Sequence, residues 1–216
     1  MTPRQFLAAL SALRFDNTFN PYSEHCATHD LAHASDIRSQ MLLGALEAAS
    51  RVGVDALWIG RDLGYRGGRR TGLPFTDDVH LRDHLARWNI EGQRPTKGKP
   101  VSERSANVVW KMLNQIDRPI FLWNVFPLHP HGPGAPFTNR MHNAAESRAG
   151  KDLLFELIAL LRPKRLIAVG NDAEGAIRGI VRDLETIKIR HPSYGGQTEF
   201  SNQVRGLYKL RPTTLF

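Results

Sequence analysis

The stretch of sequence that decides the fold reads Gly60-Arg61-Asp62-Leu63-Gly64-Tyr65-Arg66-Gly67-Gly68-Arg69-Arg70-Thr71-Gly72-Leu73-Pro74-Phe75. It follows the apolar run 54–59, which is typical of a buried strand. Because glycines and arginines do not continue such a strand, we expect a loop that leaves its carboxyl end. Ligands bind at that edge of open α/β sheets. A carboxylate, several cations and an aromatic ring would meet there, so the search for a functional site begins at Asp62.

Helix and strand patterns alternate on both sides of this loop. Apolar residues at helical spacing predict helices over residues 3–13, 35–51, 77–88, 103–116, 139–161, 172–184 and 197–209. Short apolar runs predict strands over residues 54–59, 119–126, 166–169 and 186–189. This alternation indicates an α/β fold, and we expect three α/β/α layers around a central, four-stranded, mainly parallel sheet. We also expect a single domain over 1–216, with an amino-terminal helical part, 1–53, and a core that carries the motifs, 54–210.

Composition narrows the class of protein. With 216 residues, 41% of them hydrophobic, the chain can bury one sizeable core. Its formal net charge of +8 favours an anionic partner such as nucleic acid, although a generally solvated basic surface would give the same charge. A single cysteine, Cys26, excludes an internal disulfide and an all-cysteine iron–sulfur cluster. The amino terminus lacks the apolar core of a signal peptide and no run is long enough to span a bilayer, so we expect a soluble, cytoplasmic protein.

A histidine series near the amino terminus raises the question of a metal site. His25, His29 and His33 recur at every fourth position, beside Cys26. On a helix they would form one stripe of imidazoles. Ligands spread over two helical turns cannot converge on one ion without a partner from elsewhere, so we expect no metal here.

If this topology holds, three further side chains lie at the same edge of the sheet as Asp62. Asn124 interrupts the apolar run 119–126 near its carboxyl end; it is either a core amide with satisfied hydrogen bonds or a reader of a ligand, and its place favours the ligand. His191 follows the last expected strand, and Phe75 ends the glycine loop, which lacks the ending of a P-loop. Each residue alone has a structural explanation. Together with Asp62, they suit a planar heterocycle with hydrogen-bonding edges.

These residues stand in motifs that resemble those of the uracil-DNA glycosylase superfamily. The best-known branch of that family has Gly-Gln-Asp-Pro-Tyr followed by Gly-Leu-x-Phe, and Gly60-Arg61-Asp62 and Gly72-Leu73-Pro74-Phe75 align with the two pieces without a gap. Leu122-Trp123-Asn124 is similar to the strand that bears the base-reading Asn, and His191-Pro192-Ser193 to the start of the His-Pro-Ser-Pro loop. The resemblance covers about residues 54–210. Each motif is short, but four in the right order on the right elements make chance a poor explanation.

The resemblance implies a DNA repair glycosylase that flips uracil out of the helix and leaves an abasic site. The uracil would stack on Phe75, while the Asn124 amide pairs with its O4 and N3–H and is itself pinned by a further partner. His191 would donate a hydrogen bond to O2 of the departing base, and Asp62 would orient or deprotonate the attacking water. The implied base pocket consists of Gly60, Tyr65, Phe75 and Asn124. The implied partners are uracil-containing DNA, single- or double-stranded, and free uracil; we expect a monomer that needs no metal or cofactor.

The sequence departs from the family pattern where the family excludes thymine. The family's Tyr, two positions after the catalytic Asp, crowds C5 of uracil; it aligns here with Gly64, and Tyr65 stands one place later. We therefore predict a wider range of bases than the strict uracil enzymes accept. Thymine mismatches and other deaminated or modified bases would test this prediction.

A second departure concerns the apolar residue that the family inserts into the base stack. It aligns here with Gly195, which has no side chain to insert. Tyr194 or Gln197 could serve as the wedge, or another loop, such as 127–140, could supply it. The sequence leaves these alternatives open.

Cations in the loop are candidates for DNA contacts. They are Arg61, Arg66, Arg69 and Arg70. They would hold the phosphates that flank the flipped nucleotide, or they form an ordinary solvated basic loop. Ser193 could bond a phosphate or cap the last helix.

Two other classes of function compete with a glycosylase. A non-catalytic member of the same fold could recognise damaged DNA or abasic sites. The altered wedge position and the absence of the family's Tyr keep this hypothesis open. A nucleotide-metabolising hydrolase would need a cluster of metal-binding carboxylates at the strand ends, where the sequence offers only Asp62.

Overall fold

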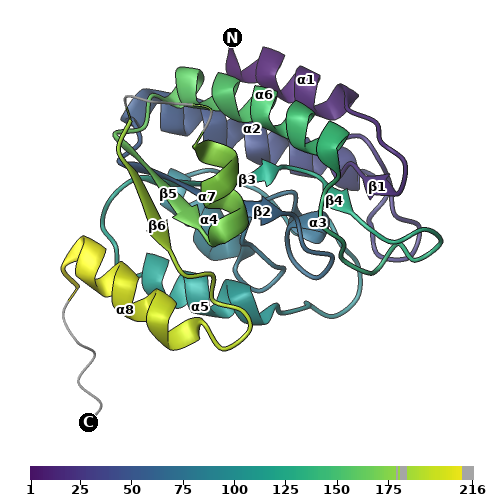
Figure 1. The fold of residues 1–216 in the computed structure, drawn as a ribbon. Helices are drawn as coiled ribbons and strands as arrows, with labels where there is room; N and C mark the ends of the chain where they lie inside the picture. The colour runs from purple at the N-terminus through teal and green to yellow at the C-terminus, as the bar shows by residue number, and fades with distance from the viewer. Residues whose placement is uncertain (179, 181–183, 211–216) are drawn as a thin grey trace.

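The computed structural model of the protein describes residues 1–178, 180 and 184–210 (Figure 1). At its centre lies a sheet with the strand order β3-β2-β5-β6, in which every neighbouring pair is parallel. The strands are β2 Ala56–Asp62, β3 Ile120–Phe126, β5 Arg165–Val169 and β6 Thr186–Ile189. The expected α/β fold is confirmed, and the central sheet is wholly rather than mainly parallel.

Helices cover both faces of this sheet. One face packs against α1 Pro3–Ala12, α2 Ala34–Val52, α4 Leu81–Trp88, α6 Ala144–Leu161 and α7 Asn171–Ile177, and the other against α5 Arg104–Leu113 and α8 Gln197–Tyr208. Figure 1 shows α1, α2 and α6 on one side of the sheet and α5 and α8 on the opposite side. Successive residues of β2 alternate between the two cores: Leu57 and Ile59 enter the larger one, and Ala56 and Trp58 the smaller. The result is the predicted arrangement of three layers.

The amino-terminal part is packed into the larger core. The ring of Phe6 on α1 lies 5.5 Å from that of Trp123 on β3. A small antiparallel sheet joins β1 Thr18–Phe19 to β4 His129–Pro130. Residues 21–33 contain turns and no helix, so the histidines of this segment do not form a helical stripe.

Two element boundaries differ from the sequence prediction at positions that matter for the site. The strand expected over 54–59 continues to Asp62, because Gly60 and Asp62 pair with β3 opposite Asn124 and Phe126. The helix expected from residue 139 begins at Ala144, after an Asn143 cap, so residues 139–143 are free to approach the sheet edge. The helix expected over 172–184 ends at Ile177, and part of its remaining length lies outside the described residues.

Candidate active site

A cavity of about 620 Å³ opens at the carboxyl edge of the sheet. Its walls come from the segments that follow β2, β5 and β6, from the end of β3, from the start of α5 and from residues 139–141. Asp62, Phe75, Asn124 and His191 all line it. Parallel strands place their carboxyl ends at one edge, which is why residues distant in sequence meet there. The structure thus brings together the four residues on which the sequence argument depends.

Both carboxylate oxygens of Asp62 are engaged, and its side chain is only 6% exposed. Arg61 donates Nε–H to Oδ2 at 2.8 Å, and Nη1 of the same arginine donates to Asp172 Oδ2 at 2.9 Å. Oδ1 lies 2.5 Å from Nδ1 of His142. Burial lowers the pKa of Arg61, but its hydrogen bonds to Asp172 and Asp62 outweigh burial and raise it above the usual value. The carboxylate is therefore held in one orientation, with its charge balanced by a permanent cation.

His142 is a site residue that the sequence reasoning missed. It lies directly before Asn143, the cap of α6, in a segment that the helical pattern assigned to the helix itself. Its ring packs 6.0 Å from that of Phe126 and its side chain is 7% exposed. The contact with Asp62 spans 80 residues of sequence, and no local pattern announces it.

Phe75 and Asn124 approach each other across Gly60. A Cβ atom at Gly60 would lie 2.5 Å from Phe75 Cζ and 2.6 Å from Asn124 Oδ1, so only glycine fits. Phe75 has a left-handed φ of 55°, and its carbonyl oxygen accepts a hydrogen bond from Trp110 Nε1 at 3.0 Å. Asn124 is 3% exposed, and its amide bonds to none of the residues that the structure describes, so the expected pinning partner is not among them. The amide lies against the backbone of Gly60, where an added Cβ atom would stand 2.6 Å from Oδ1.

His191 is a neutral imidazole whose tautomer can be assigned from its neighbours. Burial, followed by the charges of Arg61 and Arg190, lowers its pKa to about 4. The backbone N–H of Ser193 donates to Nδ1 at 3.2 Å, and Ser193 Oγ lies 2.7 Å from the same atom. Nδ1 is therefore an acceptor, and the proton of the neutral ring is on Nε2. The imidazole is prepared to donate one hydrogen bond from Nε2.

An unexpected carboxyl group, that of Glu103, lines the cavity beside the glycine loop. Glu103 caps α5, and its Oε1 lies 2.8 Å from the place where a Cβ atom of Gly64 would stand. Burial, followed by the charge of Asp77, raises the pKa of Glu103 above its usual range. The Glu103 carboxyl group thus fills the space that a side chain at position 64 would occupy.

Arg69 and Arg70 are buried, which corrects the expectation that they hold phosphates. Each is only 4% exposed. The guanidinium of Arg69 lies between the rings of Phe19 and Phe137, at 4.0 and 5.0 Å from their centroids. Arg70 donates to Asp78 Oδ2 from Nη2 at 2.7 Å and from Nε at 2.8 Å. These two cations stabilise the loop from inside, and a DNA backbone cannot reach them in this conformation.

Arg66 and Tyr65 lie on the outside of the loop. Arg66 is exposed, and its Nε donates to the Tyr65 hydroxyl at 2.7 Å, with the guanidinium 5.3 Å from the ring centroid. The backbone N–H of Tyr65 donates to Asn139 Oδ1 at 3.0 Å. Neither residue lines the described cavity, so the base-binding role of Tyr65 and the DNA-binding role of Arg66 stay predictions.

The mouth of the cavity carries two exposed apolar side chains. Tyr194 is 97% exposed, with a left-handed φ of 51°, and Met141 is 54% exposed. Both line the cavity: Met141 lies on the segment before α6, and Tyr194 on the segment after β6. Gln197 is exposed as the first residue of α8 but does not line the described cavity, and Gly196 rather than Ser193 caps that helix.

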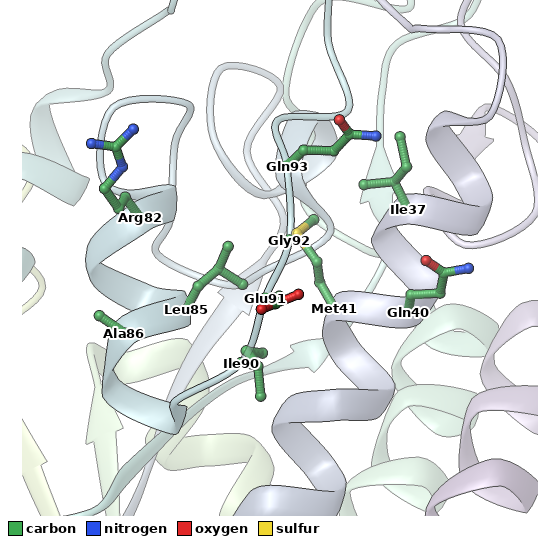
Figure 2. Close-up of a pocket in the computed structure, with 10 residues that line it drawn as sticks. All are labelled: Ile37, Gln40, Met41, Arg82, Leu85, Ala86, Ile90, Glu91, Gly92 and Gln93. Atoms are coloured by element: carbon green, nitrogen blue, oxygen red, sulfur yellow. The ribbon is translucent and has the colours of Figure 1, made fainter.

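A second hollow, of about 690 Å³, lies away from these residues (Figure 2). It is formed between α2, which carries Ile37 and Met41, α4, which carries Leu85, and the connection 90–93. None of the predicted site residues lines it. Its size alone therefore does not make it the candidate site.

The described part of the chain shows neither a metal centre nor a membrane-spanning helix. Within residues 1–178, 180 and 184–210, no group of three or more His, Cys, Asp or Glu side chains is arranged to hold a metal ion. No helix in the same ranges is both long enough and apolar enough to cross a membrane.

Comparison with known proteins gives a family and a fold. The sequence matches the family model described as the uracil DNA glycosylase superfamily over residues 50–207. No curated protein matches the sequence significantly. Among solved structures, the crystal structure of SMUG2 from Pedobacter heparinus is similar, with a TM-score of 0.57 and 16% sequence identity over 96% of each chain. At that identity the likeness shows the fold alone.

Proposed function

This chain belongs to the uracil-DNA glycosylase superfamily, and on that premise we propose that it hydrolyses the N-glycosidic bond of uracil in DNA and leaves an abasic site. The observation that carries the proposal is one cavity lined by an amide, an aromatic ring, a neutral imidazole and a carboxylate. A nucleotide flipped out of DNA presents its base and its sugar to such a pocket together. The substrate is single- or double-stranded DNA that contains uracil, and the products are free uracil and an abasic site.

Base recognition in this proposal rests on Phe75 and Asn124. The uracil ring stacks against Phe75, while the Asn124 amide donates to O4 and accepts from N3–H. Cytosine presents the opposite donor and acceptor pattern at these two positions. Gly60 keeps the ring and the amide at the spacing that lets one base touch both, since any side chain there would push them apart.

Bond cleavage in this proposal divides between His191 and Asp62. As the bond between C1′ and N1 breaks, the electron pair stays with the base, and the Nε2–H of His191 stabilises the negative charge at O2. A neutral imidazole suits this role at neutral pH, because the ring still carries its proton on Nε2 when the base enters the pocket. Asp62 stabilises the positive sugar and orients or deprotonates the water that bonds to C1′.

Glu103 defines the range of bases that we propose. Gly64 has no side chain that would crowd C5 of the base, but the Glu103 carboxyl group fills that space. A thymine methyl group would press against this carboxyl group and deny it a hydrogen-bonding partner, at a cost of about 1–3 kcal/mol. A polar substituent that carries a donor would instead satisfy it. We therefore propose a range wider than uracil that extends to polar rather than methyl substituents.

Tyr194 is the wedge that we propose. It is almost fully exposed at the cavity mouth, and an aromatic side chain there can enter the base stack as the nucleotide leaves it. Its exposed left-handed backbone conformation has no evident packing role in the free protein. Arg66, which is exposed on the glycine loop, would bind a flanking phosphate.

The proposed function is tested by cleavage of an end-labelled uracil oligonucleotide in excess EDTA, with alkali to break abasic sites. The variants are Asp62→Asn, Asn124→Ala and His191→Ala, and Asp36→Asn is a matched control because it removes an exposed carboxylate on α2. Breaks that appear only after alkali, that persist in EDTA and that fall in the three site variants alone would support a monofunctional glycosylase. Breaks without alkali, or equal loss in the control, would contradict it.

One observation favours the alternative of a non-catalytic protein that binds damaged DNA or abasic sites. Arg61 neutralises the charge of Asp62 and occupies one of its oxygens. Wild-type protein that binds the uracil oligonucleotide tightly without producing alkali-labile sites would establish this alternative.

A further inference from the structure

We propose that His142 is a positioning residue for the hydrolysis, which fixes the Asp62 carboxylate by a hydrogen bond from Nδ1. This inference rests on the proposed function of Asp62 and adds a residue outside the four motifs quoted in the sequence analysis. His142 does not itself line the described cavity, whereas its neighbours Arg140 and Met141 do. It therefore acts on the reaction through Asp62 and makes no contact with the substrate.

Two hydrogen bonds fix the orientation of the Asp62 carboxylate. Oδ1 of Asp62 lies 2.5 Å from His142 Nδ1, and Oδ2 accepts from Arg61 at 2.8 Å. An ionised carboxylate only accepts hydrogen bonds, so the shared proton belongs to Nδ1. With one donor on each oxygen, the carboxylate cannot rotate about its terminal bond, yet each oxygen keeps a lone pair for water. Arg61 is in turn held by Asp172 at 2.9 Å, so the clamp is closed on both sides.

The residues that flank His142 in the sequence are hydrogen-bonded to the start of α6. The residue after it, Asn143, caps α6 by accepting from the backbone N–H groups of Ala145 and Glu146 at 2.9 and 3.0 Å. Two residues before it, Arg140 bonds both oxygens of Glu146, at 2.6 and 2.7 Å. These hydrogen bonds on each side of His142 restrain its backbone and so limit the movement of the imidazole.

The hydrogen bonds of Glu146 extend beyond the start of the helix. Glu146 completes the capping box of α6, because its Oε2 accepts from the backbone N–H of Asn143 at 2.7 Å. Glu146 is fully buried, and besides Arg140 it accepts a hydrogen bond from Thr18 Oγ1 at 2.6 Å. A buried carboxylate with an arginine is retained only where its partners satisfy it, and here the network orders the segment that carries His142. The ring then rests on Phe126, the β3 residue that pairs with Asp62 itself.

The consequence concerns the reaction rate rather than substrate binding. A misplacement of about 1 Å at a reacting group costs roughly 100-fold in rate. Without His142, Oδ1 of Asp62 loses its hydrogen-bond donor, and the contact of Oδ2 with Arg61 alone restrains the carboxylate. DNA and base contacts made by other loops stay intact, so the affinity for substrate changes little.

The experiment measures single-turnover cleavage of the uracil oligonucleotide over a range of enzyme concentrations. It uses His142→Ala, which removes the donor, and His142→Asn, whose amide N–H can replace Nδ1–H. We expect His142→Ala to lower the maximal rate by about 10- to 100-fold with a nearly unchanged half-saturating concentration. We expect His142→Asn to recover most of the rate. Equal loss in both variants would overturn the donor role and assign the effect to the ring.

A double variant and a control separate positioning from general damage. If His142 acts through Asp62, adding His142→Ala to Asp62→Asn causes no further loss; a full additional loss would overturn the proposal. His129→Ala is the control, because His129 is buried and bonds Thr138 O in the preceding segment without touching Asp62. It should lower thermal stability but leave the rate close to that of wild type. An equal rate loss in His129→Ala would show that any loosening of the segment is sufficient.

The outcomes also distinguish this inference from the proposed function. No cleavage by wild type would refute the proposed function itself. Normal cleavage by wild type, with Asp62→Asn slowed and His142→Ala as fast as wild type, would refute only the role of His142.

Discussion

Replacing Gly60 by alanine tests whether the base pocket depends on the close approach of Phe75 and Asn124. The added Cβ atom would lie 2.5 Å from Phe75 Cζ and 2.6 Å from Asn124 Oδ1, whereas ordinary van der Waals contact begins at 3.4 Å. Each side chain must therefore retreat from the added Cβ atom by nearly 1 Å. Trp110 holds the carbonyl of Phe75, so the ring has little freedom to move as a whole.

The size of the effect follows from these displacements. Overpacking of a closely packed site costs typically about 1–3 kcal/mol of stability. A shift of about 1 Å in the groups that hold a reacting base costs roughly 100-fold in rate. We therefore expect Gly60→Ala to fold, with a lowered free energy of unfolding, and to lose about two orders of magnitude in single-turnover cleavage of uracil DNA.

The assay pairs urea unfolding with single-turnover cleavage, and the matched control is Gly206→Ala. Gly206 lies in α8, and a Cβ atom there would meet nothing within 4 Å. Since alanine is the better helix former, this control should gain up to about 1 kcal/mol of stability and cleave as wild type does. Gly60→Ala with wild-type stability and rate would refute the reasoning, because it would mean that the two side chains need not be close.

Three further predictions address the base range, the DNA surface and the pH dependence of stability. Glu103→Ala should raise thymine excision relative to uracil by at least about 10-fold, while Glu103→Gln, which keeps the shape, should not; paired excision assays on the two bases decide it. Arg66→Ala should reduce the slope of log affinity against log salt by about 1, as measured by DNA binding at several salt concentrations, whereas Arg69→Met should leave the slope unchanged and lower the melting temperature. Burial lowers the pKa of His84 to about 3, so the folded state keeps this ring neutral while the unfolded state protonates it below about pH 6.5. Stability should therefore fall as the pH drops from about 6.5 towards 3, by up to about 1.4 kcal/mol per pH unit from this group, and His84→Asn should flatten the unfolding free energy over that range.

The fold could be predicted from the sequence because its signals are local and strong. Four apolar runs separated by helical periodicity specify a parallel sheet, and the strand at 120–126 is found where the apolar run places it. The end of β2 was the weak point. Gly60 and Arg61 are poor strand residues, but β3 offers a ladder of partners through Phe126, and this tertiary pairing overrides local propensity.

The candidate site could be predicted where topology alone positions the residues. Asp62 ends β2, Asn124 lies two residues before the end of β3 and His191 follows β6, so a parallel sheet brings them to one edge. Burial of Arg69 could not be predicted, because the two aromatic rings that enclose it come from segments far away in sequence. His142 was hidden for the same reason, since only the fold shows that the chain before α6 turns back towards β2.

The buried carboxylate of Asp62 suits hydrolysis. Three carboxyl groups line the described cavity together with three cations, so the lining as a whole does not repel a polyanionic backbone; these residues are Asp62, Glu103 and Asp172 with Arg61, Arg140 and Arg190. The side chain of Asp62 is only 6% exposed, and Arg61 balances its charge in the free protein. A carboxylate at this place would stabilise the positive sugar that forms only as the glycosidic bond breaks, an interaction that a protein which only binds DNA does not need.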